Sequence, residues 1–284
     1  MRRFDLPAFL KSSVVALFLI FLSIPEIYGA GETERYNLAQ KTFLPKPISE
    51  SPKEKNEFLI DSYYSISDVV EGSRRGHWSE FTNLAMVSQE RFKIYASISE
   101  YDRLDLRDHS ANLGLYLPRG DSLLRVESGF GWDVHYLYRY QNVIEYSHKI
   151  SDGLYAQANY TYRHYAINDS HLVSPGLIYY FGDSYIMANY GASIIESRGV
   201  GHSGTVRGDF ALTDRLHWVA GVTVGEWLYD IAGLDPGKEG GYSLLTGVKV
   251  DVYKGLNLRA GFSYDTEKPK FIKRNLDLEL SFKF

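Results

Sequence analysis

The chain contains no cysteine among its 284 residues. This absence excludes disulfide bonds, thiolate metal sites, a cysteine nucleophile and a lipid anchor attached to an N-terminal cysteine. Small exported domains often depend on disulfides. If this chain is exported, its fold must therefore be held by hydrogen bonds and packing alone.

Long apolar runs are also missing after Leu22. No later stretch approaches the roughly 18 apolar residues that a membrane-spanning helix needs, so no such helix is expected. The formal net charge is −4 and basic residues do not cluster, which gives no support for nucleic-acid binding. The glycines of 201–204 and 237–241 lack the strand–helix context of a phosphate-binding loop. The sequence predicts no cofactor and no metal site.

The N-terminus has the three parts of a secretory signal. The basic residues Arg2, Arg3 and Lys11 precede an apolar run at 14–22, and small residues follow at 29–31. We expect residues 1–30 to be a signal peptide, cleaved near Gly29–Gly31. Residues 31–55 are polar, charged and rich in proline, which predicts a flexible periplasmic segment. A plug inserted in a barrel lumen is the alternative.

From residue 56 to residue 284, apolar and polar residues alternate in a series of short runs, the pattern of β-strands. Short polar turns recur between the runs and mostly contain the Gly, Asp or Ser of tight hairpins. These turns lie at 89–91, 118–121, 151–153, 182–184, 213–215 and 253–255. Longer connections alternate with these turns, at 68–77, 102–109, 131–138, 166–171, 196–202, 229–242 and 267–270.

Alternation of short and long connections is typical of outer-membrane barrels with brief periplasmic turns and longer outer loops. Six short and seven long connections join 14 strands. Weak alternation at 81–87 and 143–150 leaves 12 strands as the alternative. The fold class expected for residues 56–284 is all-β: a transmembrane, antiparallel, up-and-down β-barrel. Aromatic residues make up 15% of the chain, an excess that girdles at the two membrane interfaces would explain.

The last strand carries one apolar face and ends on an aromatic residue. Its apolar positions are Leu276, Leu278, Leu280, Phe282 and Phe284. An exposed apolar edge of this kind is an aggregation hazard in a soluble sheet, whereas a closed barrel turns that face to lipid. This strand resembles the C-terminal signal by which the barrel-assembly machinery recognises its clients, so we expect it to contact both that machinery and outer-membrane lipid.

The opposite faces of the strands carry charges of both signs, which would line the lumen. Such residues set the preference of a pore for particular ions or solutes, or they brace a narrow lumen through ion pairs. Because the signs are interleaved, bracing is the favoured interpretation. The lumen-lining candidates are Lys93, Arg125, Glu127, Arg163, Arg207, Asp209, Lys249, Asp251, Arg259 and Asp265.

Histidines accompany aspartates in the expected outer loops, as Asp108-His109, Asp133-Val-His135 and Asp169-Ser-His171, with His77 and His202 on two further loops. An aspartate beside a histidine tunes a general base or orients a nucleophile. These residue types are ordinary in loops, however, so a loop-side hydrolase is only the alternative to a protein without enzymatic activity.

Several blocks of sequence resemble the YaiO-type outer-membrane barrel family. They are Tyr63–Ser67, Trp78–Glu80, Tyr101–Arg103 with Asp108, Leu113–Pro118, Tyr138-Arg139 before Glu145-Tyr146, and Tyr179–Tyr185. The chain departs from the family at Tyr136-Leu137, where a Phe-Pro pair is common. The resemblance implies the barrel fold but no chemistry, since the family's function is unassigned. Related barrels accompany exopolysaccharide-export proteins.

Together these observations predict an integral barrel of the outer membrane of a Gram-negative bacterium. A small channel or non-catalytic surface barrel is the expected function, with a small solute or a polysaccharide as the material handled. A loop-side enzyme and an accessory barrel in envelope or exopolysaccharide export are the alternatives.

Overall fold

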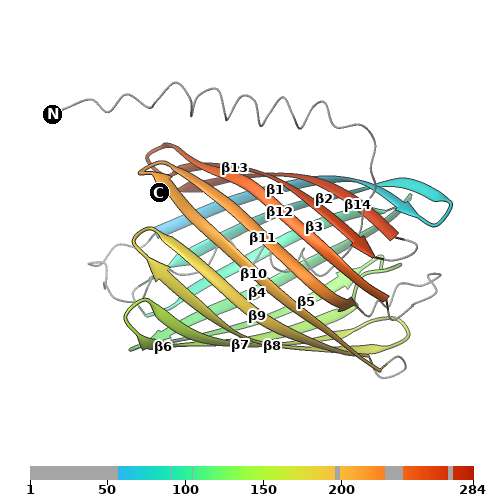
Figure 1. Cartoon of the computed structure of the whole chain (residues 1–284), viewed down its shortest axis with the longest axis horizontal. Coiled ribbons are helices and arrows are strands. Elements are labelled where there is room, and N and C mark those ends of the chain that lie inside the picture. Colours follow the sequence, from blue (N-terminus) through green and yellow to red (C-terminus); the bar gives the residue numbers. More distant parts are fainter. Residues whose placement is uncertain (1–56, 90, 104, 196–198, 228–238, 268–270) are drawn as a thin grey trace.

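The computed structural model describes residues 57–284 except 90, 104, 196–198, 228–238 and 268–270. The described residues form 14 antiparallel strands closed into one barrel (Figure 1). The strands are β1 (Glu57–Glu71), β2 (Arg74–Ser88), β3 (Lys93–Arg103), β4 (Leu106–Arg119), β5 (Ser122–Trp132), β6 (Tyr140–Ser151), β7 (Leu154–His164), β8 (Asp169–Phe181), β9 (Ser184–Ile195), β10 (Gly199–Thr213), β11 (Leu216–Trp227), β12 (Glu239–Tyr253), β13 (Leu256–Glu267) and β14 (Phe271–Lys283).

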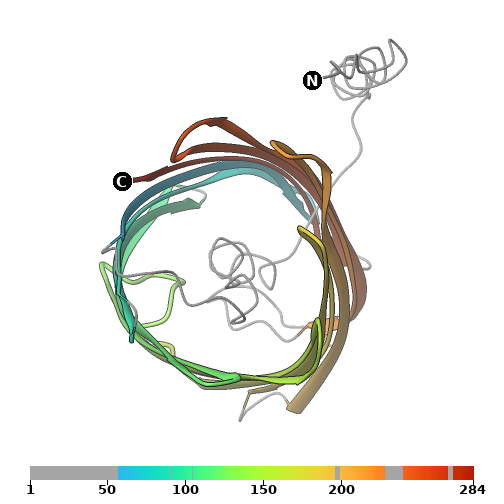
Figure 2. The ribbon, with the colours of Figure 1, turned by 90° about the vertical axis from the view of Figure 1, so that its left-hand side faces the viewer.

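Each strand pairs with its neighbours in the chain, and β1 pairs with β14 to close the ring (Figure 2). At this closing junction Tyr63 lies opposite Glu279, and Phe58 exchanges two backbone hydrogen bonds with Phe284. The predicted fold class is therefore confirmed, with 14 strands rather than 12. Closure leaves no unpaired edge, which is the requirement for a sheet surrounded by lipid.

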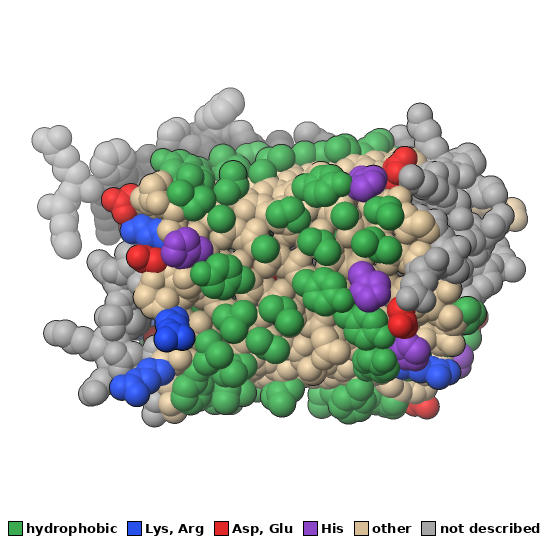
Figure 3. All heavy atoms as spheres, turned by 90° about the horizontal axis from the view of Figure 1, so that it is seen from below, with side chains coloured by type: hydrophobic (Ala, Val, Ile, Leu, Met, Phe, Trp, Pro, Cys, Tyr) green, Lys and Arg blue, Asp and Glu red, His purple; other side chains and the backbone are tan. Residues whose placement is uncertain are grey.

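The two faces of the sheet differ in chemistry as period-two alternation predicts. On β14, Leu276, Leu278 and Leu280 are 60%, 49% and 47% exposed, whereas Asp277 and Glu279 between them are buried. On the side of the barrel seen in Figure 3, apolar side chains cover the middle of the outer surface, and charged and histidine side chains gather towards its two ends. This distribution matches an apolar band flanked by interfacial residues.

We call the end of the barrel that holds Glu57 and Lys283 the inner end, and the opposite end the outer end. At the inner end the turns lie where the sequence predicts them, and several use a residue with positive φ. Gly120, Gly153, Gly182 and Gly255 have φ between 57° and 79°, a conformation that glycine adopts without steric cost.

Several outer connections are shorter than the sequence predicts, and two show this most clearly. The loops expected at 68–77 and 102–109 are mostly strand. Only residues 72–73 separate β1 from β2, and only residues 104–105 separate β3 from β4. Ion pairs across the strands stabilise these extensions: Arg75 binds Asp68 at 3.2 Å, and Arg107 binds Glu100 at 3.2 Å. Charged residues at strand ends are typical of loops in a sequence. In this structure they form ion pairs that extend the hairpins.

Three expectations fall outside the described residues. They are the signal peptide at 1–30, the segment at 31–55, and most of the long connections near 229–242 and 267–270. Within the part of the chain that is described, no helix has the length and apolar character needed to cross a membrane.

Candidate functional site: the polar inner wall

The ten lumen-lining candidates all take positions that alternate inward along their strands. Arg125, Glu127, Arg207, Arg259 and Asp265 are 1–7% exposed. Lys93, Arg163, Asp209, Lys249 and Asp251 are partly buried. The candidates come from separate parts of the ring. Arg125 and Glu127 share one hydrogen-bonded network, and Arg259 and Asp265 each join a separate ion-paired group.

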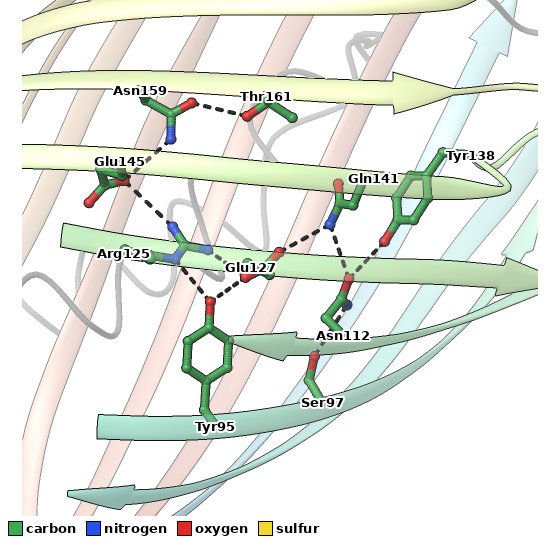
Figure 4. A network of polar contacts seen from close by, with 10 residues as sticks. All are labelled: Tyr95, Ser97, Asn112, Arg125, Glu127, Tyr138, Gln141, Glu145, Asn159 and Thr161. Carbon is green, nitrogen blue, oxygen red and sulfur yellow. Dashed lines mark hydrogen bonds and ion pairs between the residues drawn. The ribbon is translucent and has the colours of Figure 1, made fainter. Parts of the chain in front are cut away.

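The first network covers the inner wall of β3–β7 and centres on Arg125 (Figure 4). Its guanidinium donates to Glu127 Oε2 at 2.6 Å and to Tyr95 Oη at 2.9 Å, and lies 3.5 Å from Glu145 Oε2. Tyr95 also donates to Glu127. One cation is thus held between two carboxylates, and the short contacts are those expected of charge-assisted hydrogen bonds.

Uncharged side chains extend this network in both directions. Gln141 donates to Glu127 at 3.1 Å and to Asn112 at 3.0 Å, and Tyr138 donates to the same Asn112 oxygen at 3.1 Å. On the other side, Asn159 donates to Glu145 at 3.4 Å. The side chains of the whole network come from the five strands β3–β7 and one connection, so the network links the strands of this wall to one another.

The position of Tyr95 depends on the glycine beside it. Tyr95 and Gly114 lie opposite each other on β3 and β4, and a Cβ added at Gly114 would lie 2.1 Å from Tyr95 Cζ. The ring therefore occupies the space that Gly114 leaves empty. This placement brings the Tyr95 hydroxyl to Arg125 and Glu127.

Two further ion-paired groups lie on the wall of β12–β14. Arg259 donates to Glu279 at 3.1 Å and lies 3.8 Å from Asp277. Lys273 lies 3.7 Å from Asp265, which also accepts a hydrogen bond from Ser243 at 2.5 Å. Again both signs alternate, and cross-strand ion pairs join neighbouring strands.

Among the other candidates, Asp209 lies 2.6 Å from the ring of His217 near the inner end. Lys93, Lys249 and Asp251 also lie near that end, while Arg163 lies near the outer end. The structure thus brings Arg125 and Glu127 into one network and places Arg259 and Asp265 in two separate ion-paired groups. It leaves the remaining candidates spread around the ring.

The connection between β5 and β6, residues 133–139, is the second part of the site; we call it the inward loop. The carboxylate of Asp108 on β4 is completely buried and holds this loop. It accepts hydrogen bonds from the backbone N–H groups of His135, Tyr136 and Leu137 at 2.7–3.0 Å, and from His135 Nδ1 at 2.9 Å. The hydrogen bond to Asp108 raises the pKa of His135 above its ordinary value.

Arg103, the last residue of β3, also holds the inward loop. Its guanidinium lies 4.5 Å from the ring centroid of Trp78 on β2 and 4.3 Å from that of Tyr136, and is therefore held between two aromatic faces. Tyr136 and Tyr138 are 7% and 1% exposed. The loop consequently lies against the inner wall near the outer end and narrows the lumen there.

The Asp–His combinations expected in outer loops do not form as predicted. His77, His109, His171 and His202 lie in strands, and of the five histidines only His135 lies in a connection. Asp108 is buried against the inward loop, whereas its neighbour His109 stacks on Trp132 at 5.3 Å on the outer face. Adjacent strand residues point to opposite faces, so sequence neighbours are separated.

Other contacts replace those combinations. His171 contacts the Tyr160 hydroxyl at 2.9 Å, and Asp169 contacts His164 at 2.7 Å. Both lie on the outer face among aromatic rings, while Ser170 is turned to the inner face. His135 contacts Asp108, whose oxygens already bind three backbone N–H groups. These arrangements favour structural roles over a hydrolytic site.

The described residues contain no group of three His, Asp or Glu side chains arranged to hold a metal ion. The sequence did not reveal Tyr95, Asn112, Gln141 or Tyr138 as part of the site, because uncharged polar residues occur on both faces. Glu145 and Lys273 were recognisable in principle. Both take inward positions of an alternating strand, although alternation is weak around Glu145.

No family model and no curated protein matches the chain. Solved structures do match. One titled as a bacterial polysaccharide outer-membrane secretin superposes with a TM-score of 0.56 at 8% identity, over 79% of this chain and 98% of that one. The toluene transporter TodX of Pseudomonas putida gives 0.53 at 8% identity, over 90% and 94%.

A FadL homologue of Pseudomonas aeruginosa gives a TM-score of 0.52 at 9% identity, over 85% of this chain and 93% of that one. At such identities the likeness shows a shared fold, that of outer-membrane β-barrels. The resemblance to the YaiO-type family stays a prediction.

Proposed function

We propose that the protein is a channel of the bacterial outer membrane that passes small polar solutes and has no enzymatic activity. The observation that carries this proposal is the contrast between the two faces of one closed ring. The outer face is apolar, as contact with lipid requires, and the inner face bears hydrogen-bonded charges of both signs along its wall.

The arrangement of charge bears on the kind of solute. Within each of these groups every carboxylate lies near a cation, so the described wall of β3–β7 and β12–β14 alternates in sign there. A wall of this kind presents hydrogen-bond donors and acceptors without strongly repelling either cations or anions. It suits uncharged polar solutes and small ions.

The location and assembly follow from the same features. The apolar face of β14 lies in the lipid, and its last residues form the C-terminal strand that the assembly machinery recognises. A role as an accessory barrel in polysaccharide export is compatible with this fold, but no contact among the described residues favours it over a simple channel.

The proposal is tested in planar lipid bilayers with the purified protein. We expect discrete conductance steps and weak selectivity between K⁺ and Cl⁻, measured as a reversal potential in a salt gradient. Protein inactivated by heat serves as the control. The channel function would be contradicted if neither the full-length protein nor a form that lacks residues 31–52 gives discrete conductance steps.

A further inference from the structure

A group of charged side chains lies on the lipid-facing surface where β14, β1 and β2 meet at the outer end. Asp68 on β1 pairs with Arg274 on β14 and with His77 on β2. It lies two positions from Ile66, an exposed residue of the outer face, and therefore points to the same side. We call this group the cationic rim patch; its members are Asp68, Arg75, His77 and Arg274.

Positive charge exceeds negative charge in the cationic rim patch. Arg75 places Nε and Nη2 each 3.2 Å from an oxygen of Asp68, and Arg274 Nη1 lies 3.7 Å from the same carboxylate. His77 Nδ1 lies 4.0 Å from it. Two guanidinium groups thus surround one carboxylate, so the four side chains carry a net positive charge even when His77 is neutral.

The next part of the same rim has the opposite balance. On β3 and β4, Arg107 lies 3.2 Å from Glu100 and 3.4 Å from Asp102. Here one guanidinium group is shared between two carboxylates. Since neighbouring strands at the same end of the barrel differ in this way, an anionic group outside the barrel is attracted to β14–β2 and not to β3–β4.

Exposed apolar side chains lie directly deeper in the membrane than the cationic rim patch. Two residues along the strands, or about 7 Å, separate Asp68 and Arg274 from the opposed pair Ile66 and Leu276. Ile66 is 44% exposed and Leu276 is 60% exposed. A ligand with an anionic head and an apolar tail therefore matches both parts of this surface, whereas a free anion matches only the charged part.

We propose that the cationic rim patch binds the phosphate group of a lipid in the outer leaflet, with the acyl chains of that lipid against Ile66 and Leu276. Guanidinium groups match phosphate oxygens in geometry as well as in charge, and basic residues at a membrane surface attract anionic lipids. The site lies outside the lumen. It goes beyond the proposed channel, and its test does not depend on conductance.

Native mass spectrometry of the full-length protein in detergent measures lipid binding directly. The probe is phosphatidic acid, which carries a phosphate monoester, and phosphatidylcholine is the comparison without net charge. We expect phosphatidic acid to bind more tightly than phosphatidylcholine. The double variant Arg75→Gln with Arg274→Gln should weaken its binding on the order of tenfold. The matched control is Arg107→Gln on the same rim, which should leave binding unchanged.

A second variant separates lipid binding from simple bracing of the strands. Asp68→Asn removes the carboxylate that competes with phosphate for Arg75 and Arg274. We expect phosphatidic acid to bind about threefold more tightly to this variant. If the arginines serve only to neutralise Asp68, the substitution gives no gain in binding. Circular dichroism establishes that each variant is folded.

Three results would overturn the proposal. The first is equal binding of phosphatidic acid by the double variant and the unchanged protein, and the second is equal weakening by Arg107→Gln. The third is displacement of phosphatidic acid by an equal concentration of inorganic phosphate, which would show a site for free anions. If the double variant does not fold, Asp68→Asn decides alone, and unchanged or weaker binding then contradicts the lipid site.

Discussion

Arg125 is the residue on which the first network depends. It lies between Glu127 and Glu145, and its side chain is 7% exposed. Removing one member of a buried charge group leaves the others without compensation, which costs more than the group itself contributes.

We therefore expect Arg125→Ala to destabilise the barrel by about 3 kcal/mol. The measurement is thermal unfolding in detergent, followed by circular dichroism. Arg119→Ala, at an exposed position beside a turn, is the control and should have little effect. Adding Glu127→Gln to Arg125→Ala should recover part of the loss. An unfolding temperature for Arg125→Ala equal to that of the unchanged protein would contradict this role.

Gly114 gives a second prediction at the residue scale. Because its missing side chain makes room for the Tyr95 ring, Gly114→Ala should displace that ring and cost about 1–3 kcal/mol through overpacking. Near-ultraviolet circular dichroism and thermal unfolding report the change. Gly204→Ala is the matched control, because a Cβ there meets no atom within 4 Å. Equal effects of the two substitutions would argue against the packing account.

Among structural elements, the inward loop depends most clearly on a single side chain. Asp108→Asn keeps the size of the side chain but replaces one acceptor oxygen with an amide group that cannot accept a hydrogen bond. We expect residues 133–139 to become accessible to a protease while the barrel stays folded, and single-channel currents to become noisier. Asp133→Asn alters an aspartate of the same loop that is 70% exposed, and should change neither measurement.

The inward loop should also respond to pH. The pKa of His135 is raised by Asp108, so the folded loop binds the proton more tightly than the released loop does. The stabilisation from this contact is thus fully present below the ordinary pKa of histidine and is lost as pH rises through the raised value. Protease accessibility of the loop should increase with pH over that window. His135→Gln should abolish the pH dependence.

The strands could be predicted from the sequence far better than the inward loop could. Alternation and turn residues located all 14 strands, because burial against lipid imposes a strict period of two. The outer ends of β1–β4 were missed, because charged residues such as Asp68 and Arg75 are typical of loops. Asp108 was recognised as a neighbour of His109 and as part of a block that resembles the YaiO-type family, but not as the residue that holds the inward loop. Its real partners are backbone N–H groups 27 to 29 residues away, for which a sequence carries no signal.

At the scale of the whole molecule, the apolar outer face predicts the effect of a charge at mid-depth. Leu278 lies near the middle of β14 and is 49% exposed on that face. Leu278→Arg should destabilise the barrel in lipid by about 2–4 kcal/mol. Urea titration of folding into vesicles measures this change. Tyr253→Arg, at the inner rim, should cost little, and equal costs at the two sites would contradict the proposed membrane depth.

The junction between β1 and β14 has a consequence for how the barrel forms. Every other strand pair joins neighbours in the chain, whereas Ser67 donates to Asn275 across 208 positions. Contacts so distant in sequence carry the largest loss of chain entropy and raise contact order. Hairpins can therefore accumulate early, but the ring is completed only when the last strand meets the first. A chain stalled before that step displays two unpaired edges, so premature truncation should yield aggregation rather than a smaller barrel.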